Sequence, residues 1–344
     1  MTEHRKRNPI RALFIADDRP GHYNLAKGIL AAIATRAPVT IRRLDVARAR
    51  WLPSRLLALL LARGLSARTV LRLAYGLRPA DLGDADIVVS AGGNTLAANI
   101  SAARLLGVPN IFYGSLRRYR PNDVAIAFTS YEGQATHPHV VALLKPSSLD
   151  PDRFPPPQYD ATKVMGLLLG GNSGEAQFAD SDWTTLLELI TALSRMHDTR
   201  WIVSNSRRTP AAASDAFAAA ARESNGRIEL IDVRTTGPGT LDRLFRQAGA
   251  VLVSADSSTM LSEAIWLQRP VLALSPSRLK LEPAERRYRQ QLEDANLART
   301  LAIATADPNG VMAALAEITP LVDNPSRRLC DMIAARIPSL FASS

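Results

Sequence analysis

Apolar and polar positions alternate in a regular order along almost the whole chain. Short apolar runs predict buried strands, and the longer amphipathic stretches between them predict helices. Strands and helices that alternate in this way are typical of parallel α/β layers. In the first half the pattern predicts helices near 24–35 and 94–106, and strands near 10–16, 39–45, 86–91, 109–113, 124–129 and 140–144.

The second half repeats this order after a segment rich in proline. Pro146, Pro151 and the run Pro155-Pro156-Pro157 mark a linker between two parts of the chain. The strands predicted after the linker lie near 163–169, 200–204, 228–232, 250–254 and 270–274. The helices predicted between them lie near 181–196, 211–222, 240–247 and 258–267.

We therefore predict an α/β protein with two Rossmann-like domains that face one cleft. The N-terminal domain is expected to span 1–150 and the C-terminal domain 158–318. Residues 280–344 have a mostly helical pattern, and 319–344 are expected to form a helix that packs back across both domains. A chain of 344 residues is long for one hydrophobic core but suits two domains.

Composition narrows the class of protein. Cys330 is the only cysteine, which excludes a disulfide framework. The net charge of +10 favours anionic partners: a nucleotide, a phosphorylated lipid, a membrane surface or a nucleic acid. The first strand is followed at once by two aspartates, which does not fit a signal peptide. No apolar run approaches the roughly 20 residues that cross a bilayer, so we expect no integral membrane segment.

The segment 46–80 interrupts the regular pattern. It holds seven arginines and no acidic residue, with two apolar stretches separated by Gly64. Such a pair of basic amphipathic helices suits peripheral contact with an anionic membrane, and the alternative is two helices that face the core and expose their arginines to water. The arginines expected at the membrane are Arg63, Arg68 and Arg72.

A hydroxyl-rich turn between the strand 250–254 and the next helix is the first candidate for ligand binding. Free N–H groups and partial positive charge at a helix N-terminus suit a phosphate. Glu263 lies five residues past Ser258, a rise of roughly 7 Å, which matches the separation between the diphosphate and the ribose of a nucleotide. The alternative is a Ser-capped helix with a solvated Glu. The candidate donor-binding residues here are Asp256, Ser257, Ser258, Thr259, Met260 and Glu263.

Two further loops complete the expected nucleotide site. A glycine-rich turn follows the strand 163–169, and glycine allows close approach of the backbone to an anion. Two arginines among hydroxyl groups follow the strand 200–204 and suit a diphosphate. Parallel sheets bind ligands at the carboxyl ends of their strands, although each loop alone is equally explained as an ordinary connection. The candidates are Gly170, Gly171, Asn172, Ser173, Ser206, Arg207 and Arg208.

The matching edge of the first domain offers candidates for catalysis. Asp17, Asp18 and His22 follow the first strand, and any of the three is able to act as a general base toward an acceptor hydroxyl. Gly92, Gly93 and Asn94 follow another strand and are expected on the acceptor side. His137 and His139 are the only close histidine pair, without a further His or Cys to support them, so we expect no metal.

Together, Asp17…Gly21-His22, Gly170-Gly171-Asn172-Ser173-Gly174, Ser206-Arg207-Arg208-Thr209-Pro210 and Asp256-Ser257…Met260…Glu263-Ala264 resemble the motifs of one family. This is the bacterial family related to the plant "mitochondrial fission" (ELM) proteins, whose bacterial members are regarded as glycosyltransferases of cell-surface polysaccharide. The resemblance covers about 10–318. More distantly, the layout is similar to two-domain GT-B enzymes such as the lipid-linked peptidoglycan N-acetylglucosaminyltransferase.

The resemblance implies roles for individual residues. Gly171, Asn172 and Ser173 would contact the donor diphosphate or sugar, Ser258 and Thr259 the phosphate, and Glu263 the ribose. His22 matches the Gly-His element of the family, whereas Asp17 matches only as an acid after the first strand.

The function expected from these features is an inverting, metal-independent glycosyltransferase that uses no cofactor. It would transfer a sugar from a nucleotide sugar to a lipid-linked or lipopolysaccharide-core acceptor, as a cytoplasmic protein peripheral on the inner membrane. The alternatives are a nucleotide-sugar 2-epimerase of the same fold and a membrane-associated, fission-like scaffold without activity. No recognition module for nucleic acid is evident, so nucleic acid is not an expected partner.

Overall fold

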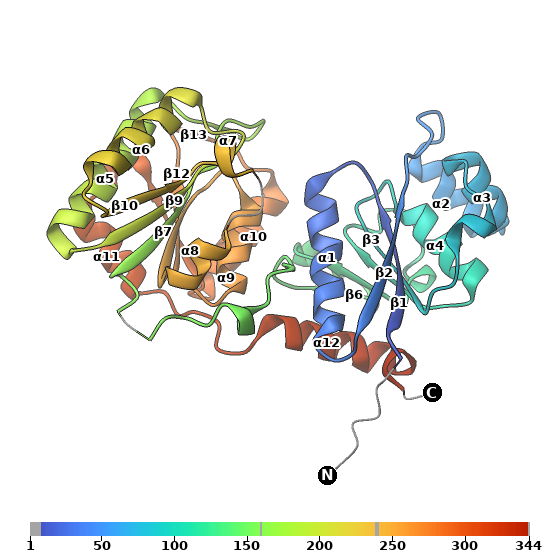
Figure 1. The fold of residues 1–344 in the computed structure, drawn as a ribbon. Coiled ribbons are helices and arrows are strands. Elements are labelled where there is room, and N and C mark those ends of the chain that lie inside the picture. The colour runs from blue at the N-terminus through green and yellow to red at the C-terminus, as the bar shows by residue number, and fades with distance from the viewer. Residues whose placement is uncertain (1–7, 159, 238–240, 343–344) are drawn as a thin grey trace, which may run out of the picture. The chain divides into compact units, whose positions relative to one another are not determined.

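The computed structural model describes residues 8–158, 160–237 and 241–342. The chain forms two compact units (Figure 1). The first unit contains Met1–Asp150 and Pro325–Ser344, and the second contains Pro151–Asn324. Each unit is built on a parallel sheet of six strands, which confirms the predicted α/β class with two Rossmann-like sheets.

The sheet of the first unit has the strand order β2-β1-β3-β4-β5-β6, with every neighbouring pair parallel. The carboxyl ends of all its strands therefore lie at one edge. The strand β1 is almost entirely buried, because apolar residues occupy both of its faces. The strands are β1 (Ile10–Ala16), β2 (Val39–Asp45), β3 (Ile87–Ala91), β4 (Asn110–Tyr113), β5 (Ile126–Thr129) and β6 (Val140–Ala142).

Helices cover both faces of this sheet (Figure 1). On one face lie α2 (Ser54–Ala62), α3 (Ala67–Tyr75) and α4 (Leu96–Leu106), where Leu13 and Ile15 of β1 join a cluster that includes Leu71 of α3. On the other face lies α1 (Pro20–Ala34), and α12 (Pro325–Arg336) packs against it. Arg36, just after α1, forms an ion pair of 3.7 Å with Asp331 of α12.

The helix α1 begins earlier than the sequence pattern predicts. Pro20 occupies the start of the helix, where its fixed φ and missing N–H carry no penalty. The prediction placed Asp17 to His22 entirely before the helix, and this is wrong for its last residues. His22 lies in the first turn of α1.

The sheet of the second unit has the order β10-β9-β7-β11-β12-β14 and is also parallel throughout. The central strands β7, β9 and β11 are neighbours, so the loops that follow them emerge side by side. The strands are β7 (Val164–Leu168), β9 (Arg200–Ser204), β10 (Ile228–Ile231), β11 (Ala250–Ser254), β12 (Val271–Ser275) and β14 (Ala298–Ala302).

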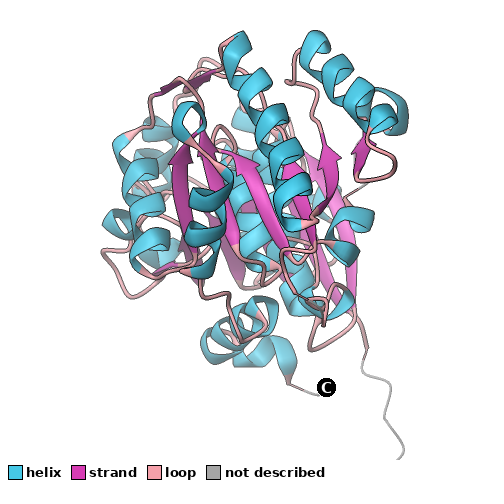
Figure 2. Cartoon of the chain, turned by 90° about the vertical axis from the view of Figure 1, so that its left-hand side faces the viewer, coloured by secondary structure: helices cyan, strands magenta, loops and turns pink. Residues whose placement is uncertain are grey.

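Helices again form a layer on each face of the sheet (Figures 1 and 2). One layer holds α5 (Asp180–His197), α6 (Ala211–Glu223) and α11 (Pro308–Ala316), which bury apolar side chains against β7, β9 and β11. The other layer holds α8 (Asp242–Gln247), α9 (Ser258–Trp266) and α10 (Pro283–Asp294). The helix predicted near 240–247 begins at Asp242 in the structure, and residue 240 lies outside the described residues.

The expectation that 280–344 is mostly helical missed the strand β14. Its residues Ala298-Arg299-Thr300-Leu301-Ala302 contain one β-branched residue and form an edge of the sheet, where a strand pattern is weak. The pattern also missed a small antiparallel pair formed by β8 (Ala176–Gln177) and β13 (Arg278–Leu279). The remaining short elements are α7 (Val233–Thr236), η1 (Pro79–Leu82), η2 (Pro121–Asp123), η3 (Glu132–Gln134), η4 (Pro151–Arg153), η5 (Ile303–Thr305) and η6 (Pro338–Phe341).

One buried arginine fixes the start of the second unit. Arg269 is 0% exposed, and its guanidinium donates hydrogen bonds to backbone carbonyls from three segments. Two of the acceptors, Phe154 and Pro155, belong to the proline-rich segment. Because a buried cation is costly without hydrogen bonds, these carbonyls and Arg269 stabilise one another, and the role of the residue is structural.

Candidate functional site

Three of the predicted ligand loops meet at the carboxyl edge of the second sheet. The N–H of Gly170, after β7, donates to Ser254 Oγ at the end of β11 over 2.6 Å. The hydroxyl of Ser206, after β9, donates to the Gly170 carbonyl over 3.1 Å. The structure thus brings together residues that are far apart in the sequence, as parallel topology requires.

The two glycines allow these loops to pack against one another. A Cβ atom on Gly170 would lie 2.1 Å from the Asp256 carboxylate, and one on Gly171 would lie 2.0 Å from the Arg208 carbonyl. The N–H groups of both glycines are already used inside the protein, by Ser254 and Asp256. The packing of the loops by itself requires glycine here, and the close approach to an anion that the sequence suggested stays a prediction.

Asn172 and Ser173, which follow the two glycines, stabilise the loop after β7 with their side chains. The side-chain oxygen of Asn172 accepts from the Phe178 N–H over 2.8 Å. The hydroxyl of Ser173 accepts from the N–H groups of Glu175 and Ala176 over 3.2 and 3.1 Å. Asn172 is exposed, and its backbone N–H has no partner in the described part of the chain. That N–H is available to a ligand.

The side chain of Asp256 is the anchor of the site. It is 0% exposed and accepts from Ser254 Oγ over 2.7 Å and from the Gly171 N–H over 3.2 Å. It also forms an ion pair of 2.7 Å with Arg208, whose side chain is 41% exposed. Asp256 therefore orients Arg208. Arg207 is exposed and has no ion pair within the described residues.

The helix α9 points its N-terminus at the same edge. Ser257 caps the helix by accepting from the Met260 N–H over 3.3 Å. Ser258 and Thr259 occupy the first turn, where N–H groups lack partners within the helix, and both residues are partly exposed. The helix dipole and these N–H groups favour an anion at this position.

Glu263 lies about one turn further along α9 and is partly exposed, and its carboxyl has no hydrogen bond or ion pair within the described residues. Burial raises the pKa of its carboxyl from 4.5 to about 7. A desolvated carboxyl without a partner is costly, and such groups are concentrated at functional sites. The Glu263 carboxyl is therefore a candidate for contact with groups that the described residues do not supply.

The helix α10 supports α9 from behind, a contribution that the sequence analysis missed. Tyr288 and Ser262 join their hydroxyl groups over 2.8 Å. Arg289 is buried, forms an ion pair of 3.0 Å with Glu285 and donates to the Ala255 carbonyl over 2.6 Å. The spacing of Glu285 and Arg289, four residues apart on one helix face, was the only signal in the sequence.

In the first unit, Asp17 and His22 form one hydrogen-bonded pair. The Asp17 side chain is 3% exposed and lies 2.9 Å from His22 Nδ1. It also accepts from the Arg19 N–H over 3.2 Å. When Nδ1 donates its proton to Asp17, Nε2 of His22 is left as an acceptor. Asp18 is exposed and stands outside this pair.

The predicted acceptor loop lies directly beside this pair. Gly92 has a left-handed φ of 84°, and a Cβ there would lie 2.1 Å from His22 Nδ1. A Cβ on Gly93 would lie 3.1 Å from Cζ of Arg117, a residue that the sequence analysis did not select. The carbonyl of Asn94 accepts from the Tyr75 hydroxyl over 2.8 Å, which ties α3 to the loop. Here the glycines make room for side chains.

The basic segment 46–80 has two different faces in the structure. Leu57 and Leu61 of α2 and Val70 of α3 are buried in the core of the first unit, as the core-facing alternative requires. The outer face exposes a group of large apolar residues: Trp51 (69%), Leu56 (37%), Leu59 (46%) and Leu73 (51%). Three exposed arginines without ion pairs in the described residues lie on the same helices or at their ends: Arg63, Arg68 and Arg72.

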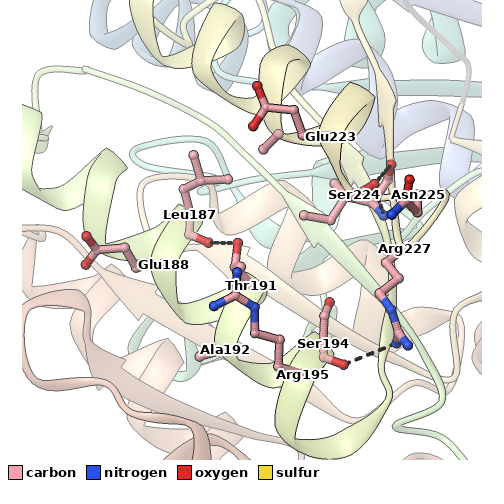
Figure 3. A pocket seen from close by; sticks show the side chains of 12 residues that line it. Leu187, Glu188, Thr191, Ala192, Ser194, Arg195, Glu223, Ser224, Asn225 and Arg227 are labelled. Carbon is pink, nitrogen blue, oxygen red and sulfur yellow. Dashed lines mark hydrogen bonds between the residues drawn. The ribbon is translucent and has the colours of Figure 1, made fainter.

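A cavity of about 680 Å³ lies away from the candidate site (Figure 3). Its lining comes from α5, the end of α6 and the segment before β10, including Glu188, Arg195, Glu223 and Arg227. These parts lie at the amino ends of the strands, where parallel sheets do not bind their ligands. Within the described ranges, no cluster of three or more His, Cys, Asp or Glu could hold a metal ion, and no helix is long and apolar enough to cross a membrane.

Solved structures with the same fold are found across nearly the full chain. The glycosyltransferase of kitacinnamycin is 12% identical with a TM-score of 0.51, over 98% of this chain and 97% of its own. UDP-GlcNAc 2-epimerase from Neisseria meningitidis, bound to UDP-GlcNAc, is 14% identical with a TM-score of 0.51, over 96% and 100%. MurG from Acinetobacter baumannii is 13% identical with a TM-score of 0.50, over 96% and 100%.

At these identities the likeness shows the fold, which GT-B glycosyltransferases and UDP-GlcNAc 2-epimerases share. A search of curated proteins finds no match. The family model described as mitochondrial fission ELM1 matches residues 138–326, more than half of the chain, and confirms the resemblance seen in the motifs. The chain therefore belongs to the mitochondrial fission ELM1 family.

Proposed function

We propose that this protein is a nucleotide-sugar-dependent glycosyltransferase of the GT-B type. The observation that carries the proposal is Glu263, a desolvated carboxyl without a partner, one turn beyond the open N-terminus of α9. Phosphate at the helix end and ribose hydroxyls on the carboxylate would satisfy both features at once. Solved neighbours with the same fold include a UDP-GlcNAc-bound enzyme, which supports this class of ligand.

The donor would be held by the second unit. Its diphosphate accepts hydrogen bonds from the first-turn N–H groups of α9, at Ser258 and Thr259. Arg207 and the oriented Arg208 supply positive charge, which stabilises the negative charge that develops on the departing nucleoside diphosphate. In this proposal the arginines perform the electrostatic task that a metal ion performs in other transferases.

The base would be the Asp17–His22 pair. His22 Nε2 takes the proton of the acceptor hydroxyl while the hydroxyl oxygen forms a bond to the anomeric carbon of the sugar. The bond from that carbon to the diphosphate breaks in the same step, so configuration is inverted. Asp17 acts as a positioning residue, because it holds the imidazole orientation and stabilises the imidazolium that forms.

The acceptor would be lipid-linked, or belong to a lipopolysaccharide core, at the cytoplasmic side of the inner membrane. The exposed apolar residues and unpaired arginines of 46–80 support peripheral contact with an anionic bilayer. Each arginine near such a surface contributes about 1 kcal/mol. Replacing Arg63, Arg68 and Arg72 with Gln should release the protein from anionic vesicles in sedimentation, whereas replacing three other exposed arginines, Arg195, Arg222 and Arg327, should not.

A 2-epimerase is the second candidate, because solved 2-epimerases share the fold over nearly the whole chain. Incubation with UDP-GlcNAc separates the two enzymes. An epimerase converts the sugar without an acceptor, whereas a transferase releases UDP by slow hydrolysis or by transfer. A fission-like scaffold, the third possibility that the family description raises, does neither.

The proposal is tested by titration against a panel of nucleoside diphosphates. We expect binding by the wild-type protein and loss of affinity in Glu263→Gln. Glu223→Gln is the matched control, since Glu223 is an exposed glutamate at the opposite edge of the same unit. Absence of binding by wild-type protein to every nucleotide of the panel would overturn the proposed function.

A further inference from the structure

A small cavity in the first unit has arginines as its only charged lining residues. Its volume is about 350 Å³, and its lining includes four arginines: Arg48, Arg55, Arg117 and Arg118. Ser54 and Tyr119 supply hydroxyl groups, and no lining residue is acidic. None of the four guanidinium groups forms an ion pair within the described residues. The proposed transfer reaction, as derived above, does not use this cavity.

Three separate segments build the cavity. Arg48 follows β2, and Pro53, Ser54 and Arg55 lie at the start of α2. Arg117, Arg118 and Tyr119 belong to the loop between β4 and β5. The Ser54 hydroxyl donates to the Tyr119 hydroxyl over 3.4 Å, which joins two of the segments. The N-terminus of α2 has no side-chain cap, because its N-cap residue is Pro53. Its first N–H groups add to the positive potential of the cavity.

The arrangement is unfavourable without an anion. Like charges gathered in a recess repel one another, and nothing in the lining neutralises them. Nε of Arg48 is buried and has no hydrogen-bond partner in the described structure, although its Nη1 donates to the Leu52 carbonyl. A buried donor left in this state costs about 1–3 kcal/mol. An anion bound in the cavity reduces the repulsion among the four arginines.

The chemistry of the lining selects a phosphoryl group. Guanidinium groups bind phosphate oxygens in a bidentate manner, and the tyrosine and serine hydroxyls are further donors. A carboxylate carries one negative charge, whereas a phosphate monoester or a diphosphate carries about two. Four arginines without a counter-charge therefore match a phosphate monoester or diphosphate better than a carboxylate.

Arg117 connects the cavity to the proposed catalytic pair. It has a left-handed φ of 52°, unusual for a residue other than glycine, and its guanidinium packs against Gly93. The preceding residue, Gly92, packs against His22. One short loop thus contacts both the base and an arginine of the cavity. A phosphoryl group bound there lies near the hydroxyl that His22 deprotonates.

We propose that this cavity binds the phosphate or diphosphate group of the acceptor, so that the acceptor is a phosphorylated glycan or lipid. The identification of the ligand as an acceptor rests on the proposed function, but binding of a phosphoryl group at these arginines does not. The double variant Arg48→Gln/Arg117→Gln removes two guanidiniums from the cavity. The matched control Arg195→Gln/Arg222→Gln removes the same charge from exposed positions of the second unit.

The experiment is a calorimetric titration with inorganic pyrophosphate in the presence of excess UDP, which occupies the proposed donor site. We expect the cavity variant to bind at least about ten-fold more weakly than wild type, and the control to stay within about two-fold. Arg55→Gln/Arg118→Gln, two arginines that make no hydrogen bond in the described structure, serves as a second cavity variant if the first unfolds. Equal affinity of wild type and both cavity variants would overturn the proposal, as would an equal loss in the control.

A second experiment with vesicles distinguishes a lipid from a soluble molecule as the source of the phosphoryl group. Retention on phosphatidylcholine vesicles that contain a polyprenyl diphosphate, lost in the cavity variants and competed by pyrophosphate, assigns the group to a lipid. Pyrophosphate binding without retention assigns it to a soluble phosphorylated acceptor. Failure of UDP to bind, while pyrophosphate still binds in the cavity, would contradict the proposed transferase function but support the phosphoryl-binding site.

Discussion

The carboxyl edges of the two sheets share one architecture but use charge in opposite ways. In the second unit Asp256 is buried against Arg208, Arg289 pairs with Glu285, and the Glu263 carboxyl has no hydrogen bond or ion pair within the described residues. In the first unit the arginines of the small cavity are unpaired, and the buried carboxylate Asp17 is bound to a histidine. Most charged groups described at the second edge are thus paired inside the protein, whereas the first edge exposes arginines beside a buried Asp–His pair.

The glycines at the two edges differ in the same way. Gly170 and Gly171 permit contact between loops, since a Cβ on either would collide with an atom of a neighbouring loop. Gly92 and Gly93 make space for the side chains of His22 and Arg117. A glycine-rich turn after a parallel strand therefore does not identify a phosphate site by itself. The contacts of each glycine decide its role.

The largest expected effect concerns the base that we propose in the first unit. His22→Gln keeps the shape of the side chain but removes the proton acceptor, so turnover should fall by about 10²–10⁴-fold. Nucleotide affinity should stay unchanged, because the residues proposed to bind the donor belong to the other unit. Release of nucleoside diphosphate in the presence of acceptor measures turnover, and Asp18→Asn, at an exposed residue outside the pair, is the control. Near-wild-type turnover in His22→Gln would show that His22 is not the base.

The next effect concerns the unpaired carboxyl of the second unit. Glu263→Gln should weaken nucleotide binding by roughly 1.5–3 kcal/mol, the range for hydrogen bonds to a charged group. Titration calorimetry measures the affinity, and a thermal unfolding curve checks that the fold is intact. A folded variant with wild-type affinity removes the ribose role from Glu263, and with it the main contrast between the two edges.

Substitution of a loop glycine tests the packing of the second edge. Gly171→Ala places a methyl group 2.0 Å from the Arg208 carbonyl, so backbone must shift, and we expect a loss of about 1–3 kcal/mol in the free energy of unfolding. Gly174→Ala is the matched control in the same loop, where a Cβ meets no atom within 4 Å. Chemical denaturation compares the two. Equal stabilities would mean that the loop has room for a side chain.

The smallest effect is a pH dependence of nucleotide binding. The pKa of Glu263 is raised to about 7, and ribose hydroxyls donate to the ionised carboxylate, so affinity for UDP-GlcNAc should fall as the pH drops below 7. The stability of the protein without ligand should depend on pH in the opposite direction. A carboxyl whose pKa is raised on folding favours the folded state at low pH, and this contribution is lost between about pH 4.5 and 7 as the pH rises.

This pH prediction is checked by titrations from pH 6 to 8 and by unfolding curves over the lower range. UDP-GlcNAc is the suitable ligand, because its diphosphate has no free terminal group that titrates near neutrality. Both trends should disappear in Glu263→Gln. Parallel pH profiles of wild type and variant would assign the effect to another group.

The sequence by itself determined the class of fold and most of its strands. Apolar runs such as Ile10–Ala16 are buried on both faces, and burial of the strand depends on its own residues. It also placed the ligand loops at one edge of each sheet, because parallel topology follows from alternating strands and helices. The sequence pattern did not predict the strand β14, because it is an edge strand with few β-branched residues. Its pairing with β12 is a tertiary contact.

Only the tertiary structure decided which residues act together. The sequence left the base open among Asp17, Asp18 and His22, with a slight preference for His22. The packing buries Asp17 against His22 and leaves Asp18 exposed. Two cavity arginines belong to the basic segment 46–80 and two to the loop between β4 and β5, and only the fold brings these two regions together. The raised pKa of Glu263 depends on desolvation by its surroundings. Local patterns fix which elements form, but burial and charge at a site depend on neighbours that only the folded chain brings together.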